Sequence, residues 1–214
     1  MSQIFHRSTN ALARFSIFGA VFFLVGLTGI WWTLNRTYST RQDLVVYQPV
    51  PFSHQHHVEA MGIQCVYCHT SVTESKFAGI PPTATCMNCH KEIWKDAPML
   101  ELVRASLRED TPIEWSRVTD LPDFVYFNHS IHVASGMGCA TCHGRVDKMP
   151  LMRQHATLEM SWCLDCHRDP AKYVRPKEEV FNMAWEAEDQ EALGARLVEE
   201  YGLRSLLNCS TCHR

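Results

Sequence analysis

The amino-acid sequence predicts a mainly α-helical and irregular fold with one N-terminal transmembrane helix. Two observations lead to this fold class. Residues 15–34 form a run of twenty residues without a charge, which is long enough for a helix to cross the hydrocarbon core of a bilayer. The rest of the chain carries five copies of the pattern Cys-x-x-Cys-His, which use all ten cysteines. Flat apolar groups bound at these motifs would supply much of the interior, so little regular secondary structure is needed.

The five Cys-x-x-Cys-His motifs predict covalent attachment of five haem c groups. Two thiols three residues apart lie on one helical turn, where each can form a thioether with a haem vinyl group. Zinc sites and disulfide frameworks also use paired cysteines, but neither requires a histidine directly after every second cysteine. Zinc and disulfides are therefore the alternatives to haem. The predicted attachment residues are Cys65, Cys68, Cys86, Cys89, Cys139, Cys142, Cys163, Cys166, Cys209 and Cys212.

Residues 15–34 are predicted to be an uncleaved membrane anchor. A signal peptide is the alternative, but its apolar core would be unusually long, and no clear small-x-small cleavage site precedes Trp31. Trp31 and Trp32 also suit a membrane interface. Because c-type haem is attached outside the cytoplasm, we expect a single-pass protein of a bacterial cytoplasmic membrane with residues 1–14 in the cytoplasm. Residues 35–48 would be a linker to a haem domain on the periplasmic, extracytoplasmic side.

A repeat of the pattern Phe-x-His-x-x-His-Val divides the haem-bearing part into modules. One copy begins at Phe52 and the other at Phe127, and each is followed by a glycine-containing turn and two haem motifs. The second motif follows the first by 21 residues in one copy and by 24 in the other. The predicted organisation is a first dihaem module over 49–97, a connector over 98–121, a second dihaem module over 122–176, and a helical segment with the fifth haem site over 177–214.

Two short helices are expected outside the modules. Residues 98–108 begin with a proline and can form one of them within the connector. Residues from about 177 to 201 are rich in Glu, Ala and Leu, with Leu193 and Leu197 at helical spacing. Since glycine lowers helix stability, we expect this second helix to be broken or weakened at Gly194.

Charge argues against a nucleic-acid partner. The formal net charge of the chain is −3, and the two propionates of each haem would make the mature domain more acidic. Nucleic-acid binding requires a basic surface instead.

Each iron needs a proximal ligand and a distal ligand, and the distal ligand decides whether the iron only passes electrons or also binds a substrate. The predicted proximal ligands are the histidines that end the motifs, namely His69, His90, His143, His167 and His213.

The repeat supplies four predicted distal ligands, His54, His57, His129 and His132. Histidines three residues apart share one face of a helical turn, where each can reach a different iron. His56 has no counterpart in the second repeat, so we expect a structural role for it.

Three residues between the third and fourth motifs are candidates for the fifth distal ligand. The choice stays open, and we prefer a methionine. The candidates are Met149, Met160 and His155.

The stretch Phe127-Asn-His-Ser-Ile-His resembles the cytochrome c3/c7 group, a class III-like multihaem cytochrome c fold in which paired histidines bind irons of two different haems. With its anchor, two modules and terminal fifth site, nearly the whole chain resembles the pentahaem cytochrome c subunit of bacterial alternative complex III. The segments Leu121-Pro-Asp-Phe-Val-Tyr-Phe-Asn-His and Gly144-Arg-Val-Asp-Lys-Met-Pro add to this resemblance.

The resemblance implies an electron-transfer subunit that does no bond chemistry itself. Its partners would be an iron–sulfur subunit and a polytopic quinol-binding subunit of a quinol-oxidising respiratory complex, with a cytochrome c or a terminal oxidase as acceptor. Two alternatives stay open. A multihaem reductase of a small oxyanion would need an iron with an open distal position, and a stand-alone quinol dehydrogenase feeding a periplasmic reductase would need its own quinone site.

Overall fold

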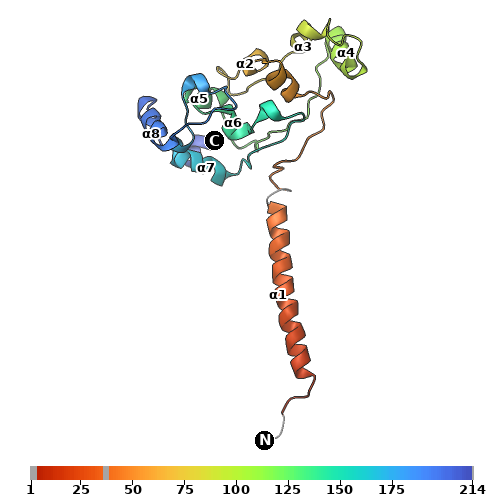
Figure 1. The fold of residues 1–214 in the computed structure, drawn as a ribbon, viewed down its shortest axis with the longest axis vertical. Helices are drawn as coiled ribbons and strands as arrows, with labels where there is room; N and C mark the ends of the chain where they lie inside the picture. Colours follow the sequence, from red (N-terminus) through yellow and green to blue (C-terminus); the bar gives the residue numbers. More distant parts are fainter. Residues whose placement is uncertain (1–3, 36–38, 214) are drawn as a thin grey trace. The chain divides into compact units, whose positions relative to one another are not determined.

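The computed structural model describes residues 4–35 and 39–213, and it divides into two compact units at residues 42 and 43 (Figure 1). Residues 1–3 of the predicted cytoplasmic segment and residues 36–38 of the predicted linker lie outside the described residues. Below, residues 1–42 are the N-terminal unit and residues 43–214 are the C-terminal unit.

The N-terminal unit is built around one long helix, α1 (Thr9–Thr33). It begins before the predicted residue 15, because the residues ahead of Phe15 include good helix formers and no proline. None of its residues is buried, and an 18-residue window within it has a mean hydropathy of 1.9, so by length and composition it is a candidate membrane span. The Thr28 hydroxyl donates to the carbonyl of Leu24, which satisfies this polar group within the helix.

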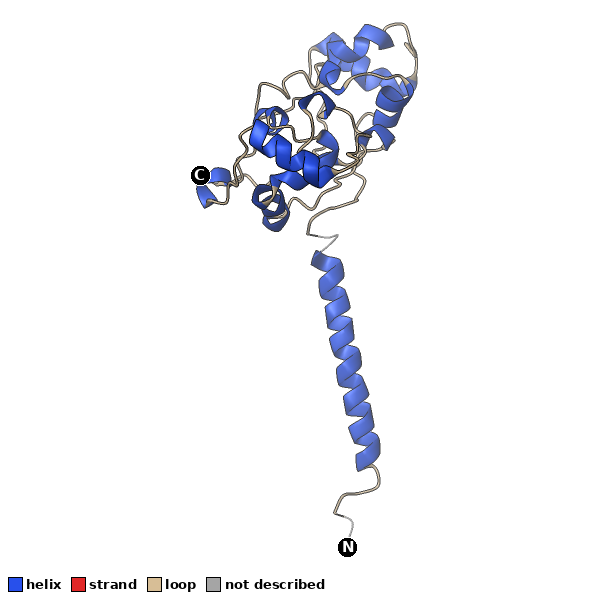
Figure 2. Cartoon of the chain, turned by 60° about the vertical axis from the view of Figure 1, so that its left-hand side comes forward, coloured by secondary structure: helices blue, strands red, loops and turns tan. Residues whose placement is uncertain are grey.

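The C-terminal unit consists of short helices and irregular chain, as predicted. Residues 43–213 contain no β-strand and only isolated bridges, such as those between Val45 and Arg153 and between Met137 and Val174 (Figure 2). The α-helices are α2 (Cys65–Cys68), α3 (Thr83–His90), α4 (Glu101–Glu109), α5 (His129–Ala134), α6 (Cys139–His143), α7 (Met160–Arg168), α8 (Gln190–Glu200) and α9 (Cys209–Cys212). The other helical turns are the π-helix η2 (Gln55–Ala60) and the 3-10 turns η3 (Pro98–Leu100), η4 (Val146–Lys148), η5 (Pro170–Lys172) and η6 (Lys177–Glu179).

Side chains alone give the C-terminal unit only a small core. Its buried apolar residues are few. One cluster joins Val50 to Leu100 and Val103 of the connector. Large apolar side chains such as Phe77 and Phe124 stay about two-thirds exposed. Such a unit buries little apolar surface by itself, which is expected when flat apolar cofactors supply much of the interior.

The connector helix is confirmed. The predicted helix over 98–108 is present as η3 and α4, with Pro98 at the first helical position and Asp110 in the left-handed conformation at the end. An ion pair between Arg104 and Glu101 reinforces the first turn of α4.

The second predicted helix is present, but it is shorter and Gly194 does not break it. Helix α8 begins at Gln190, where Asp189 caps it by accepting a hydrogen bond from the amide of Ala192 at 3.0 Å. Gly194 is buried, and a Cβ atom on it would lie 1.9 Å from the carbonyl oxygen of Ala171. The glycine therefore allows the backbone of α8 to approach η5 closely, which local helix propensity does not reveal.

Replacing Gly194 by alanine should destabilise the C-terminal unit by about 1–3 kcal/mol, because α8 must move away from η5 to relieve the contact. Thermal unfolding of the holoprotein, followed by the haem absorbance, measures this loss. Replacing the exposed Ala195 by glycine is the matched control, since it costs only about 1 kcal/mol of helix propensity. An unchanged midpoint for Gly194→Ala would show that the close approach is not needed.

Candidate haem sites

Each Cys-x-x-Cys pair lies on one helical turn, as covalent attachment to a single ring requires. The five pairs occupy α2, α3, α6, α7 and α9, and the histidine of each motif closes or directly follows its helix. All ten thiols are free, and no disulfide forms among them. Across residues 4–35 and 39–213, no three His, Cys, Asp or Glu side chains come together to hold a metal ion.

The two Phe-x-His-x-x-His repeats have the same local geometry. Phe52 stacks on His57 with ring centroids 4.4 Å apart, and Phe127 stacks on His132 at the same distance. Each phenylalanine also meets the first histidine of its pair edge-on, at 4.9 Å for Phe52 and 4.8 Å for Phe127. The phenylalanine of the motif thus orients both histidines.

Three predicted distal histidines face predicted proximal histidines. The ring centroids lie 6.2 Å apart for His57 and His90, and 6.2 Å apart for His132 and His167. They lie 6.3 Å apart for the nearly parallel rings of His129 and His143. In both modules, the second histidine of the repeat thus faces the histidine of the module's second motif. In the second module, the first histidine of the repeat, His129, also faces the histidine of the first motif, His143.

His54 completes the pattern. By the repeat it corresponds to His129, so the repeat predicts His69 as its partner, and His69 contributes to the lowered pKa of His54. Among the described residues, its Nδ1 atom is buried and has no hydrogen-bond partner.

Backbone carbonyl groups orient most of these imidazoles. The Nδ1 atom of His57 donates to the carbonyl of Ser53 at 2.8 Å, and that of His132 donates to Asn128 at 2.7 Å. A proton on Nδ1 leaves the lone pair on Nε2, which is then free to bind a metal. The remaining such bonds are His69 to Gly79, His90 to Ile93, His129 to Lys76 and His213 to Phe124.

Burial favours the neutral imidazole at His54 and His143. Burial, together with the nearby rings of His69, His57 and His143, lowers the pKa of His54 to about 4. Burial, with His129 and His69 adding to it, lowers the pKa of His143 to about 4. A neutral imidazole is the form that ligates a metal, so the electrostatics of the site agree with its geometry.

These residues fit haem iron. A separation of 6.2–6.3 Å between facing rings leaves room for one ion with a nitrogen ligand at about 2 Å on each side. A cavity of about 350 Å³ lies beside Cys65 and is lined by residues that include Ile63 and Met183. Beside Cys139, the Nε atom of Arg175 is buried without a hydrogen-bond partner in the part of the chain that the structure describes. An anionic propionate would satisfy such a group.

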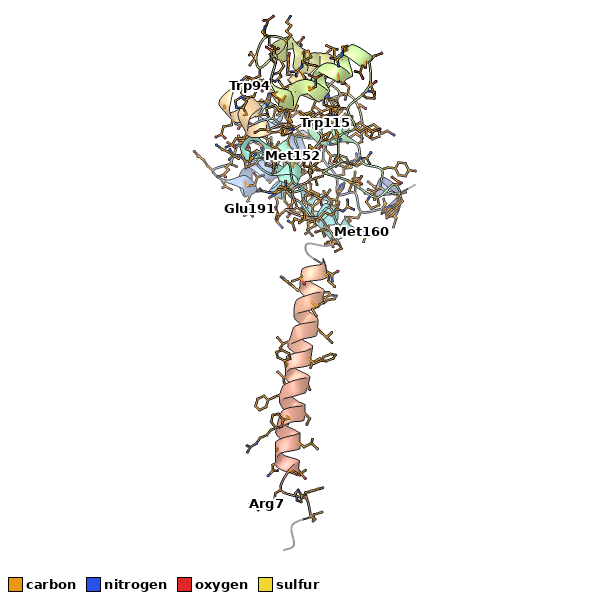
Figure 3. The ribbon with its side chains drawn as sticks, turned by 90° about the vertical axis from the view of Figure 1, so that its right-hand side faces the viewer. Arg7, Trp94, Trp115, Met152, Met160 and Glu191 are labelled. Atoms are coloured by element: carbon orange, nitrogen blue, oxygen red, sulfur yellow. The ribbon has the colours of Figure 1, made fainter. Side chains whose placement is uncertain are left out.

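The three candidates for the fifth distal ligand lie in different places. Met149 is buried, and its carbonyl accepts from the amide of Gln55 in the first module. His155 is exposed, and its ring lies against Gly144, directly after the third motif. Met160 is 68% exposed and begins α7, the helix of the fourth motif (Figure 3).

Two aromatic residues were not singled out by the sequence. Trp94 stacks on His56 with ring centroids 5.6 Å apart and lies 6.2 Å from the ring of His90. The exposed ring of Phe124 lies 5.7 Å from that of His213. His56 thus has a packing contact, in keeping with its predicted structural role. The only sequence signal for these two residues was their position. Trp94 lies within five residues of the proximal His90, and Phe124 lies within five residues of the repeat that begins at Phe127.

Comparison with known proteins supports a cytochrome. Residues 125–214 match the family described as cytochrome c7 and related cytochrome c. The multihaem cytochrome c subunit of menaquinone reductase from Nitratidesulfovibrio vulgaris is 32% identical over 130 residues, which cover 58% of this chain and 59% of that protein. The chain therefore spans less than two-thirds of this relative. The family match implies covalently bound haem c, and residues 125–214 form a cytochrome c7-like region of a mostly helical and irregular multihaem chain.

Proposed function

We propose that this protein is a membrane-anchored, five-haem electron relay within a quinone-linked respiratory complex. The observation that carries the proposal is the set of facing histidine rings, at 6.2–6.3 Å, on opposite sides of three predicted iron positions. Bound haem would supply reversible one-electron chemistry at each site. An iron with two protein ligands has no open position for a substrate, so these sites suit electron transfer rather than bond chemistry.

The residues of the chain have three tasks in this proposal. The cysteines would hold the haem groups, and the paired imidazoles would bind their irons. Carbonyl groups such as those of Ser53 and Asn128 fix the imidazole orientation through Nδ1. Helix α1 would anchor the chain in the bacterial cytoplasmic membrane, with the C-terminal unit on its extracytoplasmic side.

The proposed partners rest on two similarities, one to a known relative and one to a family of respiratory complexes. The relative from Nitratidesulfovibrio vulgaris is named as a subunit of a menaquinone reductase, which supports a quinone-linked complex. The resemblance to alternative complex III supports quinol oxidation, with an iron–sulfur subunit and a polytopic quinol-binding subunit as partners. In that direction, a cytochrome c or a terminal oxidase receives the electrons.

We also propose Met160 as the fifth distal ligand. It begins α7, the helix that carries Cys163, and its side chain is 68% exposed rather than packed in the core. Met149 and His155 contact the first module and the third motif instead. A methionine ligand favours ferrous iron and would give this site the highest potential of the five.

The test is a spectroscopic count of haems in the purified full-length protein. We expect five haems per chain, all low-spin, with four bound by two imidazoles and one by histidine and methionine. Magnetic circular dichroism in the near infrared separates these ligand pairs, and mass spectrometry counts the haems. The reduced protein should not bind carbon monoxide.

Other outcomes would favour the alternatives. A high-spin fraction that binds nitrite would favour a multihaem reductase. Oxidation of a quinol by the purified chain alone would favour a stand-alone quinol dehydrogenase. A chain without haem would contradict all three functions.

A further inference from the structure

The two attachment sites within each module are neighbours. The Asn88 side chain, inside the second motif, donates to the hydroxyl of Tyr67, inside the first, at 3.1 Å. In the second module, the Cys142 thiol is half-buried, and Cys166 is its strongest charged neighbour. The distal histidines of this module support the same conclusion. His129 and His132 share one helical turn, and His129 faces the third motif while His132 faces the fourth.

The two modules meet through their first sites. The amide and the Nδ1 atom of His129 both donate to the carbonyl of Lys76, in the loop after the first motif. Next to it, the amide of Ser130 donates to the carbonyl of Ser75. Cys65 is the strongest charged neighbour of Cys139. The third site therefore adjoins the first site, although the second site precedes it in the sequence.

The fifth site adjoins the fourth. The amide of Tyr126 donates to the carbonyl of Cys212 at 2.8 Å, which fixes α9 against the chain just ahead of α5. The Nδ1 atom of His213 donates to the carbonyl of Phe124 at 3.1 Å, in the same stretch ahead of α5, the helix whose His132 faces the fourth motif. In Figure 1 the helices α3 and α4 lie at one end of the C-terminal unit, and α7, α8 and the carboxyl terminus lie at the other.

Exposure marks the second and fifth sites as different from the rest. Cys89 and Cys209 are exposed, whereas the other eight cysteines are half-buried. Each of these two sites also has an exposed aromatic ring beside its proximal histidine, Trp94 at the second and Phe124 at the fifth. Figure 3 places Trp94 and Met160 on opposite sides of the C-terminal unit.

We propose that the five haem sites form one row in the order second, first, third, fourth, fifth, with electron entry and exit at the exposed second and fifth sites. This inference rests on the proposed relay function. Each electron that a reduced donor gives to one end is matched by one electron that an oxidised acceptor takes from the other, with no bond made or broken. The sequence order, by contrast, would make the first site an end.

Electron paramagnetic resonance of the full-length holoprotein tests the order. In His129→Met, the third iron acquires a higher potential, so two electron equivalents reduce it to the diamagnetic ferrous state together with the fifth iron, which the proposed Met160 ligand already keeps at high potential. The magnetic coupling of its neighbours to this iron then disappears. We expect the signal of the first haem to lose its coupling and that of the second to stay unchanged. The variants His54→Met and His57→Met assign these two signals.

The opposite result, a change in the second haem signal and none in the first, would overturn the order. If His129→Met does not fold, reduction of the first iron in His54→Met should change both the second and the third signals. A change in the second signal alone would also contradict the row. His56→Gln is the control and should alter no coupling. Loss of the haem signals altogether would contradict the relay itself, so the two failures are distinguishable.

Discussion

Replacing His132 by alanine should convert one low-spin haem into a high-spin haem that binds carbon monoxide when reduced. The ring of His132 faces that of His167 at 6.2 Å, and its Nδ1 atom is held by the carbonyl of Asn128. Alanine removes the distal ligand and leaves a space that water or a small ligand can fill. Optical spectra of the reduced protein with and without carbon monoxide measure the change, which should equal one haem per chain.

Two further variants sharpen this prediction. In His132→Met the haem should stay low-spin, while its potential rises on the order of 0.1 V, since axial ligands set potentials over a range of about 0.8 V. In His56→Gln neither spin state nor potential should change, because His56 faces Trp94 and not an iron position. A fully low-spin spectrum for His132→Ala would exclude His132 as a ligand.

Replacing Cys139 and Cys142 together by serine should prevent the protein from accumulating. Their site adjoins the first and fourth sites, and burial raises the pKa of Cys142 to about 12. An unfilled haem space of roughly 300 Å³ costs about 7 kcal/mol at about 24 cal/mol per Å³. That cost is comparable with the whole stability of a typical domain, about 5–15 kcal/mol. The amount of haem-stained protein in membranes measures this effect.

The matched control is the same double substitution at Cys209 and Cys212. Cys209 is exposed, so this variant should accumulate with one haem fewer, as mass spectrometry would show. Equal accumulation of both variants would contradict the central position of the third site.

Local patterns predicted the fold class well, and the attachment sites stay a prediction from the same patterns. Thiol spacing and helical geometry extend over one turn, so they can be read from sequence, and the short helices of the C-terminal unit confirm the fold class. The distal histidines were found because the repeat presents them twice. Their roles as ligands stay a prediction, which the facing of His57 with His90 supports.

Long-range contacts could not be predicted in the same way. The approach of His129 to Lys76, 53 residues away in the chain, depends on how the two modules pack. The close contact of Gly194 with Ala171 likewise makes a helix-weakening residue into a packing residue. Aromatic contacts such as that of Phe124 with His213 join segments 89 residues apart, so no local pattern signals them.

The hydrogen bonds from imidazole Nδ1 atoms to carbonyl oxygens have a kinetic consequence. Six of the predicted ligands are tethered to the main chain itself. A ligand held in this way hardly moves when its metal changes oxidation state, so the reorganisation energy of each transfer is small. Because the acceptor of each hydrogen bond is a main-chain carbonyl group, which every residue has, the neighbouring side chains can vary without weakening the bond.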